Sequence, residues 1–174
     1  RDALRNMGKP LAAAEVLILG AAYREDVGDT RYSGSEVMVR KLAEMGADVK
    51  VHDPYVEHWW ELEAQDTYPH PGYSLKRFFH RQDQLVNLRI QPDLKAALNG
   101  VDAVVFAVRH QQYLKLDPDA VFRQVGKPFA VVDCFCILSD AQIRRYLELG
   151  CEVKGMGRGH IKRIKDALSA SKRA

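Results

Sequence analysis

The sequence lacks the features that mark a disulfide-bonded or membrane-bound protein. It has only three cysteines, Cys134, Cys136 and Cys151, in 174 residues. An odd count in a chain of ordinary core-forming composition argues against a disulfide framework and favours a reducing compartment. No apolar run approaches the ~18 residues that a membrane-spanning helix needs, and residues 1–9 lack the apolar centre of a signal peptide. We therefore expect a cytoplasmic protein with no membrane partner.

A large net charge of one sign is also absent, because 26 Lys and Arg and 23 Asp and Glu leave a net charge of +3. That excess is too small to indicate nucleic-acid binding. A nucleic-acid-binding module remains an alternative, since KRFFHR at 76–81 interleaves basic and aromatic residues and residues 154–173 are rich in Lys and Arg. A basic surface loop and a helix with cations toward its C-terminal end explain both stretches more simply, so no nucleic-acid partner is expected.

Short apolar runs alternate with amphipathic stretches, which is the pattern of an α/β domain with a parallel sheet. The run EVLILG at 15–20 is the clearest strand, because it is continuous, aliphatic and ends in glycine. This order predicts a doubly wound, Rossmann-like parallel sheet of five or six strands with helices on both faces. The expected strands are 15–20, 47–52, 102–108, 129–133 and 151–155, and the expected helices are 34–45, 92–98, 118–125, one capped by Ser139 and a last one through Ile161 and Leu168.

The turn after the first strand lacks glycine where a dinucleotide site needs it. Ligands of such a sheet bind beyond the carboxyl ends of the strands, and a dinucleotide requires G-x-G-x-x-G there so that the backbone can approach the pyrophosphate. The chain reads G-A-A-Y-R-E-D, with Gly20 alone, so this loop should not bind NAD in the standard way. Asp53 ends the second strand, where a ribose-binding acid often lies, but we interpret it as the start of a turn before Pro54.

Residues 55–91 are too long for a simple connection in such a fold. They contain Trp59 and Trp60, a Pro-rich break at 68–73 and the basic-aromatic cluster at 76–81. We interpret about 56–91 as a variable insertion. Its two tryptophans are expected to cover the core, and the alternative for them is a subunit contact.

The segment EVLILGAAYREDVGDTRYSGSE at 15–36, followed by GADVKVHDP at 46–54, carries a family pattern. It resembles the C-terminal domain of the UDP-glucose/GDP-mannose dehydrogenase family, which reads approximately V-L-G-L-A-F-K-x-x-x-x-D-x-R-E-S, a helix, and then G-A-x-V-x-x-Y-D-P. The resemblance continues through 93–117, 129–140 and 148–158, so that it covers nearly the whole chain except the insertion.

The resemblance implies one part of a larger enzyme, and the absence of an initial Met agrees with a fragment. Residues 1–10 would end a central helix that forms a homodimer, and residues 11–174 would form the domain that binds a UDP-sugar. A domain upstream of residue 1 would bind NAD and carry the catalytic cysteine, so no catalytic residue is expected here. The whole enzyme would oxidise the sugar CH2OH to a carboxylate in two hydride transfers, through a thiohemiacetal and a thioester. The chain alone would be inactive, and the alternative is a module that binds nucleotide or dimerises without catalysis.

Three residues match binding positions of the family. Tyr23 and Arg24 stand where the family has Phe-Lys, which implies a ring that frames the sugar-binding loop and a cation that contacts the diphosphate or the sugar edge. Arginine keeps the charge of lysine but changes the donor geometry, and the alternative is a solvated surface arginine. Arg31 matches the family arginine on the NAD side of the interdomain cleft, with pairing to Asp29 as the alternative. The neighbouring Ser33 and Ser35 could cap the helix that follows.

The sequence departs from the family after the fourth expected strand. Residues 133–136 read D-C-F-C where many members read D-G-R-x with an arginine that contacts the nucleotide. Arg109 or Arg158 could replace that arginine. His110-x-x-Tyr113 stands in place of the Trp-containing loop of glucose-type members, which favours the branch that uses UDP-N-acetylhexosamines.

No metal site is expected. Cys134 and Cys136, considered with His110, could suggest a zinc site, but a C-x-C pair needs two further ligands at suitable spacing, and none is near in the sequence. We interpret both cysteines as small apolar residues that pack at a strand end.

Overall fold

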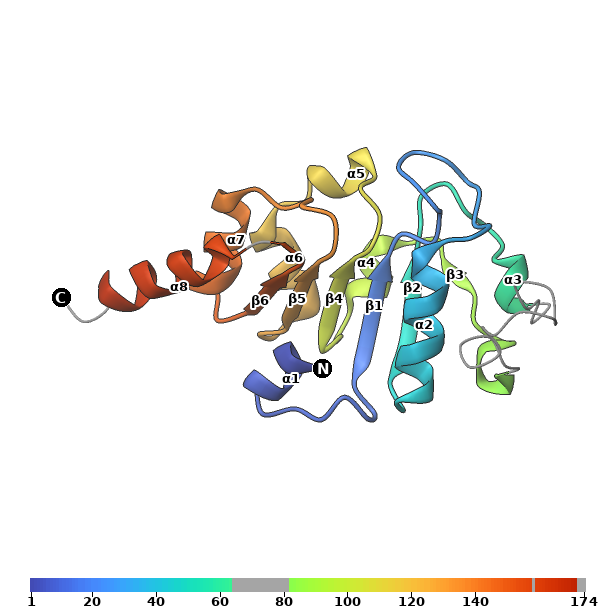
Figure 1. The fold of residues 1–174 in the computed structure, drawn as a ribbon, viewed down its shortest axis with the longest axis horizontal. Coiled ribbons are helices and arrows are strands. Elements are labelled where there is room, and N and C mark those ends of the chain that lie inside the picture. Colours follow the sequence, from blue (N-terminus) through green and yellow to red (C-terminus); the bar gives the residue numbers. More distant parts are fainter. Residues whose placement is uncertain (64–81, 158, 172–174) are drawn as a thin grey trace.

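The computed structural model describes residues 1–63, 82–157 and 159–171. They contain one six-stranded sheet in which all neighbouring strands run parallel, in the order β3-β2-β1-β4-β5-β6 (Figure 1). The predicted doubly wound sheet of five or six strands is therefore confirmed. The strands are β1 (Glu15–Leu19), β2 (Asp48–His52), β3 (Ile90–Gln91), β4 (Ala103–Phe106), β5 (Ala130–Asp133) and β6 (Glu152–Gly155).

Strand β1 lies in the middle of the sheet because it is aliphatic on both faces. Val16 and Ile18 pack into the core on one face and Leu17 and Leu19 into the core on the other. Burial on both faces explains why this strand reads as a continuous apolar run. The strand predicted at 102–108 is shorter, because the backbone N–H groups of residues 107 and 108 both bond to the carbonyl of Leu19 rather than continuing the ladder.

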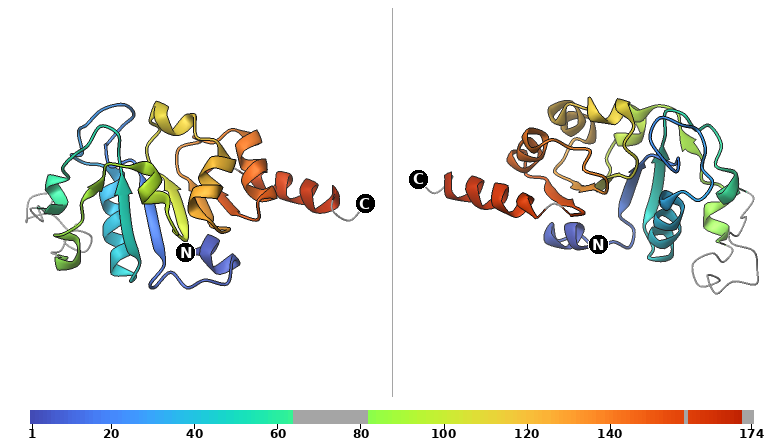
Figure 2. Two further views of the ribbon diagram at one scale, coloured as in Figure 1. Left: turned by 180° about the vertical axis from the view of Figure 1, so that it is seen from behind. Right: turned by 45° about the horizontal axis from the view of Figure 1, so that its top comes forward.

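Helices cover both faces of the sheet. They are α1 (Asp2–Asn6), α2 (Gly34–Glu44), α3 (Trp60–Glu63), α4 (Leu94–Leu98), α5 (Gln111–Leu114), α6 (Pro118–Val125), α7 (Asp140–Glu148) and α8 (His160–Ser171). Figure 1 shows α2 in front of the sheet, and the view from behind in Figure 2 brings α4 and α6 forward. Val39 of α2 packs in one core cluster, whereas Leu98 of α4 and Ile143 of α7 pack in the other. Among the described helices, none has the length and apolarity needed to cross a membrane.

Capping contacts confirm where two of the predicted helices begin. At the start of α2, Ser33 Oγ accepts a hydrogen bond from the N–H of Ser35 at 3.1 Å, so Ser33 is the cap and Ser35 lies within the first turn. At the start of α7, Ser139 and Gln142 form a capping box. The first of these caps also fixes the point at which the loop after β1 ends.

The stretch 55–91 contributes to the sheet. Its last residues form β3, which pairs with β2, so the end of the predicted insertion supplies the sixth strand. Trp59 is fully buried in the core, as expected, whereas Trp60 is 64% exposed, so the expectation of core cover was wrong for that residue. The Pro-rich break and the KRFFHR cluster lie at 64–81, outside the described residues.

The first ten residues pack against the same domain. Ala3 and Leu4 of α1 are buried in the core cluster that also contains Val39. Lys9 Nζ donates a hydrogen bond to the carboxylate of Asp102 at the amino end of β4. Residues 1–10 are thus attached to the domain both by apolar packing and by the contact with Asp102.

Candidate functional site

The loops that follow β1, β2, β4 and β5 meet at one edge of the sheet, at the top of Figure 1. The loop after β1 begins at Gly20, which has a φ of 107°. A Cβ at Gly20 would lie 2.4 Å from the Cβ of Val108, so only glycine lets the chains leaving β1 and β4 approach this closely. This loop, residues 20–33, carries all three residues that the family pattern singled out.

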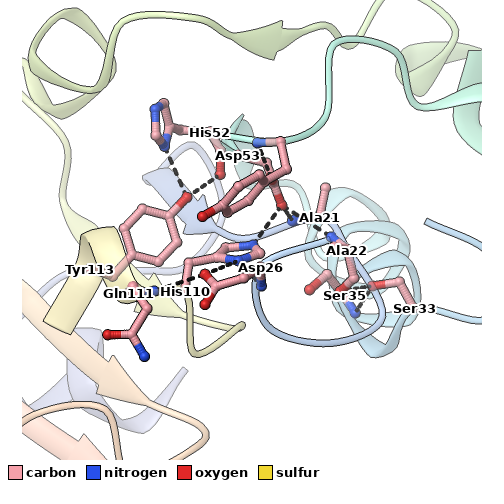
Figure 3. A network of polar contacts seen from close by, with 11 residues as sticks. Ala21, Ala22, Asp26, Ser33, Ser35, His52, Asp53, His110, Gln111 and Tyr113 are labelled. Atoms are coloured by element: carbon pink, nitrogen blue, oxygen red, sulfur yellow. Dashed lines mark hydrogen bonds and ion pairs between the residues drawn. The ribbon is translucent and has the colours of Figure 1, made fainter. Parts of the chain in front are cut away.

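Asp53, directly after β2, holds the start of the loop. Its Oδ2 accepts hydrogen bonds from the N–H groups of Ala21 at 2.7 Å and Ala22 at 3.1 Å, and its Oδ1 accepts one from the N–H of Tyr55 at 2.8 Å (Figure 3). The bond to Tyr55 is the predicted turn, whereas the bonds to the two alanines were not predicted. Burial by itself would raise the pKa of the Asp53 carboxyl, but hydrogen bonds from His110, Tyr55 and Ala21 lower it below its ordinary value. Asp53 is thus a buried, ionised anchor for the loop.

His110, which follows β4, bridges Asp53 and the far part of the same loop. Its Nδ1 lies 2.8 Å from the backbone nitrogen of Asp26, and its Nε2 lies 3.1 Å from Asp53 Oδ2. Because a backbone N–H can only donate, Nδ1 must accept, and the ring proton lies on Nε2, which donates to Asp53. The ring has no exposed surface. His110 is therefore a neutral internal brace and does not face solvent.

Asp26 ties three loops together. Its backbone N–H donates to His110, its carboxylate accepts the N–H of Gln111 at 3.0 Å, and the hydroxyl of Tyr55 also hydrogen-bonds to that carboxylate. The bond from Gln111 is the largest cause of a pKa below the ordinary value for Asp26. The φ of Asp26 is 55°, in the left-handed region that residues other than glycine seldom adopt. The contacts across the loops hold it in that conformation.

This loop does not fit the pyrophosphate of NAD. In a glycine-rich turn the first backbone N–H groups after the strand face the phosphates, but here the N–H groups of Ala21 and Ala22 are both taken by Asp53. The hydroxyl of Ser33 donates to the carbonyl of Ala22 at 3.1 Å and closes the loop further. The loop thus lacks the glycines of a dinucleotide site, and its first backbone N–H groups are hydrogen-bonded within the protein.

Tyr23 and Arg24, the predicted substrate-binding residues, lie beside each other on the exposed side of the loop. Tyr23 is 48% exposed, and the guanidinium carbon of Arg24 lies 5.4 Å from the centre of the Tyr23 ring. That distance suits a cation–π contact. Within residues 1–63, 82–157 and 159–171, no carboxylate forms an ion pair with Arg24. Its charge is therefore available to an anionic ligand.

Arg31, the predicted cofactor-facing residue, is paired with Asp29. Its Nε and Nη2 donate to the two carboxylate oxygens at 2.9 Å and 2.6 Å, which is the alternative that the sequence left open. The side-chain hydrogen bond from Arg31 is the main reason that the pKa of Asp29 falls to about 2. Both residues line an open groove of about 740 Å³ with Tyr55 and Trp60, and Arg24 is not part of its lining. Arg31 and Arg24 thus have different surroundings, since Arg31 lines the groove and Arg24 does not.

The loop after β5 is organised by Asp133. Its Oδ1 accepts the N–H of Ile137 at 2.9 Å and its Oδ2 accepts the N–H of Leu138 at 3.1 Å. Cys134 is half-buried against the core, as predicted, but Cys136 is exposed with a φ of 54°, so the prediction of packing was wrong for Cys136. The turn that Asp133 imposes brings residue 136 to the surface. In the described parts of the chain, no cluster of His, Cys, Asp or Glu is suited to hold a metal ion.

Of the two candidates to replace the missing family arginine, only Arg109 lies within the described residues. Arg109 is exposed, directly before His110 in the loop after β4. Arg158 lies outside the described residues. The structural roles of His110 and Asp26 were not predicted, although a polar residue just beyond a buried strand, at the edge of the sheet where ligands bind, was a usable signal.

Three comparisons with known proteins show what this chain is similar to. Residues 17–140 match the model of the UDP-glucose/GDP-mannose dehydrogenase family, UDP binding domain. The UDP-glucose 6-dehydrogenase of Bos taurus is 29% identical over 145 residues, which are 83% of this chain and 27% of that protein. An NDP-N-acetyl-D-galactosaminuronic acid dehydrogenase from Methanosarcina mazei Go1 superposes with a TM-score of 0.70 and 26% identity, over 92% of this chain and 28% of that one. A UDP-D-ManNAc dehydrogenase from Pyrococcus horikoshii, with a TM-score of 0.65 and 20% identity over 91% of this chain and 29% of that one, supports the fold alone.

This chain spans about a quarter of the length of the proteins it matches, 27% for the bovine relative. The family match extends from β1 to the start of α7 and includes the loops after β1, β2, β4 and β5. The chain therefore belongs to the UDP-glucose/GDP-mannose dehydrogenase family, of which it is the UDP-binding domain.

Proposed function

We propose that this chain binds the uridine diphosphate part of a UDP-sugar at the loops beyond β1, β4 and β5, with Tyr23 and Arg24 as contact residues. The observation that carries the proposal is the Arg24 guanidinium, which lies after the central strand without a carboxylate partner in the described chain. A cation at the carboxyl end of a parallel strand is well placed to meet a diphosphate. The exposed ring of Tyr23 borders the same place.

The internal hydrogen bonds of the loop support the assignment of phosphate binding to side chains. The backbone donors of Ala21 and Ala22 are occupied by Asp53. Negative charge on a ligand would then be met by Arg24, with the exposed Arg109 in place of the arginine that other members carry after β5. An arginine pair can bind two phosphates through several N–H groups at once.

We propose further that the whole protein is an NAD-dependent 6-dehydrogenase that oxidises the CH2OH of UDP-glucose or a UDP-N-acetylhexosamine to a carboxylate. NAD and the catalytic cysteine would belong to another domain, because the loop after β1 does not fit the pyrophosphate of NAD. Arg31 would face that domain across the groove, where it would exchange Asp29 for a cofactor group. A homodimer through a helix that continues into α1 and a cytoplasmic location complete the proposal. The free thiols of the three cysteines agree with a reducing compartment.

Calorimetric titration with UDP tests the binding role. The chain should bind UDP, and Arg24→Ala should bind it about tenfold or more weakly, because a hydrogen bond to a charged group contributes about 1.5–3 kcal/mol. Arg144→Ala is the matched control, since Arg144 is an exposed arginine on α7. Equal affinity in Arg24→Ala and the unmodified chain would remove Arg24 from the site, and a folded chain that binds no UDP would end the proposal.

A second titration tests which part of the substrate this domain holds. UDP, UDP-glucose and UDP-N-acetylglucosamine should bind with affinities that agree within about threefold, or about 0.65 kcal/mol, because the sugar would face the other domain and add no strong contact to this one. The chain alone should reduce no NAD with either sugar nucleotide. Reduction of NAD by the purified chain would contradict the division of roles.

A further inference from the structure

One of the contacts that attach the part of the loop carrying Arg24 to the sheet is made by a buried side chain, His110. The N–H of Tyr23 donates to the carbonyl of Asp29 at 2.9 Å, which closes residues 23–29 into a compact turn. Asp26 lies at the centre of that turn, and its N–H donates to Nδ1 of His110. His110 in turn donates to Asp53, which holds residues 21 and 22. The imidazole therefore connects the start of the loop to its tip (Figure 3).

The surroundings of His110 exclude a direct contact with a ligand. Its ring is fully buried, with the rings of Tyr55 and Tyr113 at centroid distances of 5.1 Å and 5.5 Å. Both ring nitrogens are used, one by Asp26 and one by Asp53. An imidazole in this state has no lone pair or proton left for a substrate. Any effect of His110 on binding must pass through the loop.

We propose that His110 is a positioning residue for the diphosphate of the UDP-sugar, because it fixes the 23–29 turn and so places Arg24. This inference rests on the proposed function. Asp26 holds an unfavourable left-handed φ of 55°, so the turn needs a contact to keep it in place. When the binding-competent form of a loop is only partly populated, the apparent affinity falls by the populated fraction.

Two substitutions separate the two hydrogen bonds of the ring. In His110→Asn, the amide oxygen stands where Nδ1 stood and can still accept the N–H of Asp26, while the bond to Asp53 is lost. In His110→Gln, the amide nitrogen stands where Nε2 stood and can still donate to Asp53, while the N–H of Asp26 loses its acceptor. Both variants lose one buried hydrogen bond, so a purely structural role predicts equal effects. A positioning role predicts that only the second variant loses affinity for UDP.

UDP titration of the full 174-residue chain and its variants tests the inference. His110→Gln should bind UDP about fivefold to tenfold more weakly, the equivalent of one hydrogen bond, and His110→Asn should stay within about twofold of the unmodified chain. Tyr113→Phe is the control, because it removes buried hydrogen bonds to His52 in the same cluster and leaves residues 21–33 untouched. Equal affinity in the Gln variant and the unmodified chain, or equal weakening in the Gln and Asn variants, would overturn the positioning role.

An amide-exchange measurement on the unmodified chain covers the case in which the variants fail to fold. The amide proton of Asp26 should exchange at least about tenfold more slowly than that of Glu25, because an amide that is hydrogen-bonded in a buried contact exchanges only when the loop opens. Exchange of Asp26 as fast as that of Glu25 would overturn the inference. Failure of the unmodified chain to bind UDP would instead refute the proposed function, and the positioning role with it.

Discussion

Arg40 and Glu36 form an ion pair inside the protein, with Arg40 Nε 2.8 Å from Glu36 Oε1 and side chains only 2% and 3% exposed. The two residues are four apart on α2, so the helix itself brings them together. Arg40 also joins α2 to the stretch 55–91, since its Nη2 donates to the carbonyl of Glu61 and its own carbonyl accepts from Gln82. The Glu61 carboxylate accepts the hydroxyl of Thr30 in the loop after β1. The insertion is thus attached to the site through a buried polar network.

Breaking this buried ion pair should lower the free energy of unfolding far more than breaking an exposed ion pair would. Removal of one partner takes this ion pair from the buried charge that remains, so Arg40→Met and Glu36→Gln should each lower the free energy of unfolding by about 3 kcal/mol or more. The double variant should lose clearly less than the two separate losses together. Urea unfolding measures all three. Lys41→Met is the control for an exposed pair with Glu44 and should cost under about 0.5 kcal/mol. Additive losses would show that the two side chains do not interact.

Asp53→Asn should destabilise the protein and loosen the loop. An asparagine amide would direct N–H groups at the donors of Ala21, Ala22 or Tyr55, so at least one buried donor would be left without an acceptor. We expect a loss of about 2–3 kcal/mol in the free energy of unfolding. Asp117→Asn is the control, because Asp117 caps α6 and asparagine caps a helix as well as aspartate does. An equal, small loss in both variants would contradict the anchoring role of Asp53.

Gly28→Ala should disturb the groove that Arg31 lines. A Cβ at Gly28 would lie 2.5 Å from the backbone carbonyl oxygen of Tyr55, so one of the two loops must move. Overpacking of this kind lowers the free energy of unfolding by about 1–3 kcal/mol. Gly34→Ala is the matched control, because nothing lies within 4 Å of the added carbon and alanine favours a helix. Melting temperatures measure both, and a Gly28→Ala chain as stable as Gly34→Ala would show that the approach to Tyr55 is not tight.

The lowered pKa of Asp102 should make the free energy of unfolding fall at acid pH. Burial would raise the pKa of its carboxyl, but hydrogen bonds from Lys127 and Lys9 outweigh burial and lower the pKa from 3.8 to about 2. A carboxyl with a lowered folded-state pKa stabilises the protein above its unfolded-state pKa, and this contribution is lost as the pH falls from about 4 to about 2. The contribution at neutral pH is about 2 kcal/mol.

Asp102→Asn should therefore be less stable than the unmodified chain at neutral pH, and the difference should vanish by about pH 2. Urea unfolding across this pH range measures the difference. Lys127→Met, which removes one of the two lysine partners, should move the pKa of Asp102 part of the way back toward its ordinary value in an NMR titration. A stability difference that does not change with pH would contradict the ion-pair explanation.

Much of the fold could be predicted from the sequence because local pattern and burial agree along most of the chain. The aliphatic run at 15–20 and the caps at Ser33 and Ser139 placed β1, α2 and α7 within one or two residues. The sixth strand could not be predicted, because β3 has only two residues and lies within a stretch that resembles a loop. Trp60 and Cys136 were misplaced for a related reason, since residue type alone does not reveal which way an irregular segment turns.

The candidate site could be predicted only in part. The family pattern pointed to Tyr23, Arg24 and Arg31, but it did not show that Arg31 is paired with Asp29 while Arg24 has no ion-pair partner in the described chain. Nor did the sequence show that His110 supports the loop. These facts depend on contacts between segments that the chain order separates widely.

The sequence by itself determined the α/β class, the order of most strands and helices, and the lack of a glycine-rich turn after the first strand. Those features follow from local composition and periodicity. Only the tertiary structure decided which polar groups satisfy one another, because Asp53 reaches Ala21 across 32 residues and His110 reaches Asp26 across 84. Hydrogen bonds depend on distances of a few ångströms, and such distances between remote residues exist only after the sheet has brought its strand ends together.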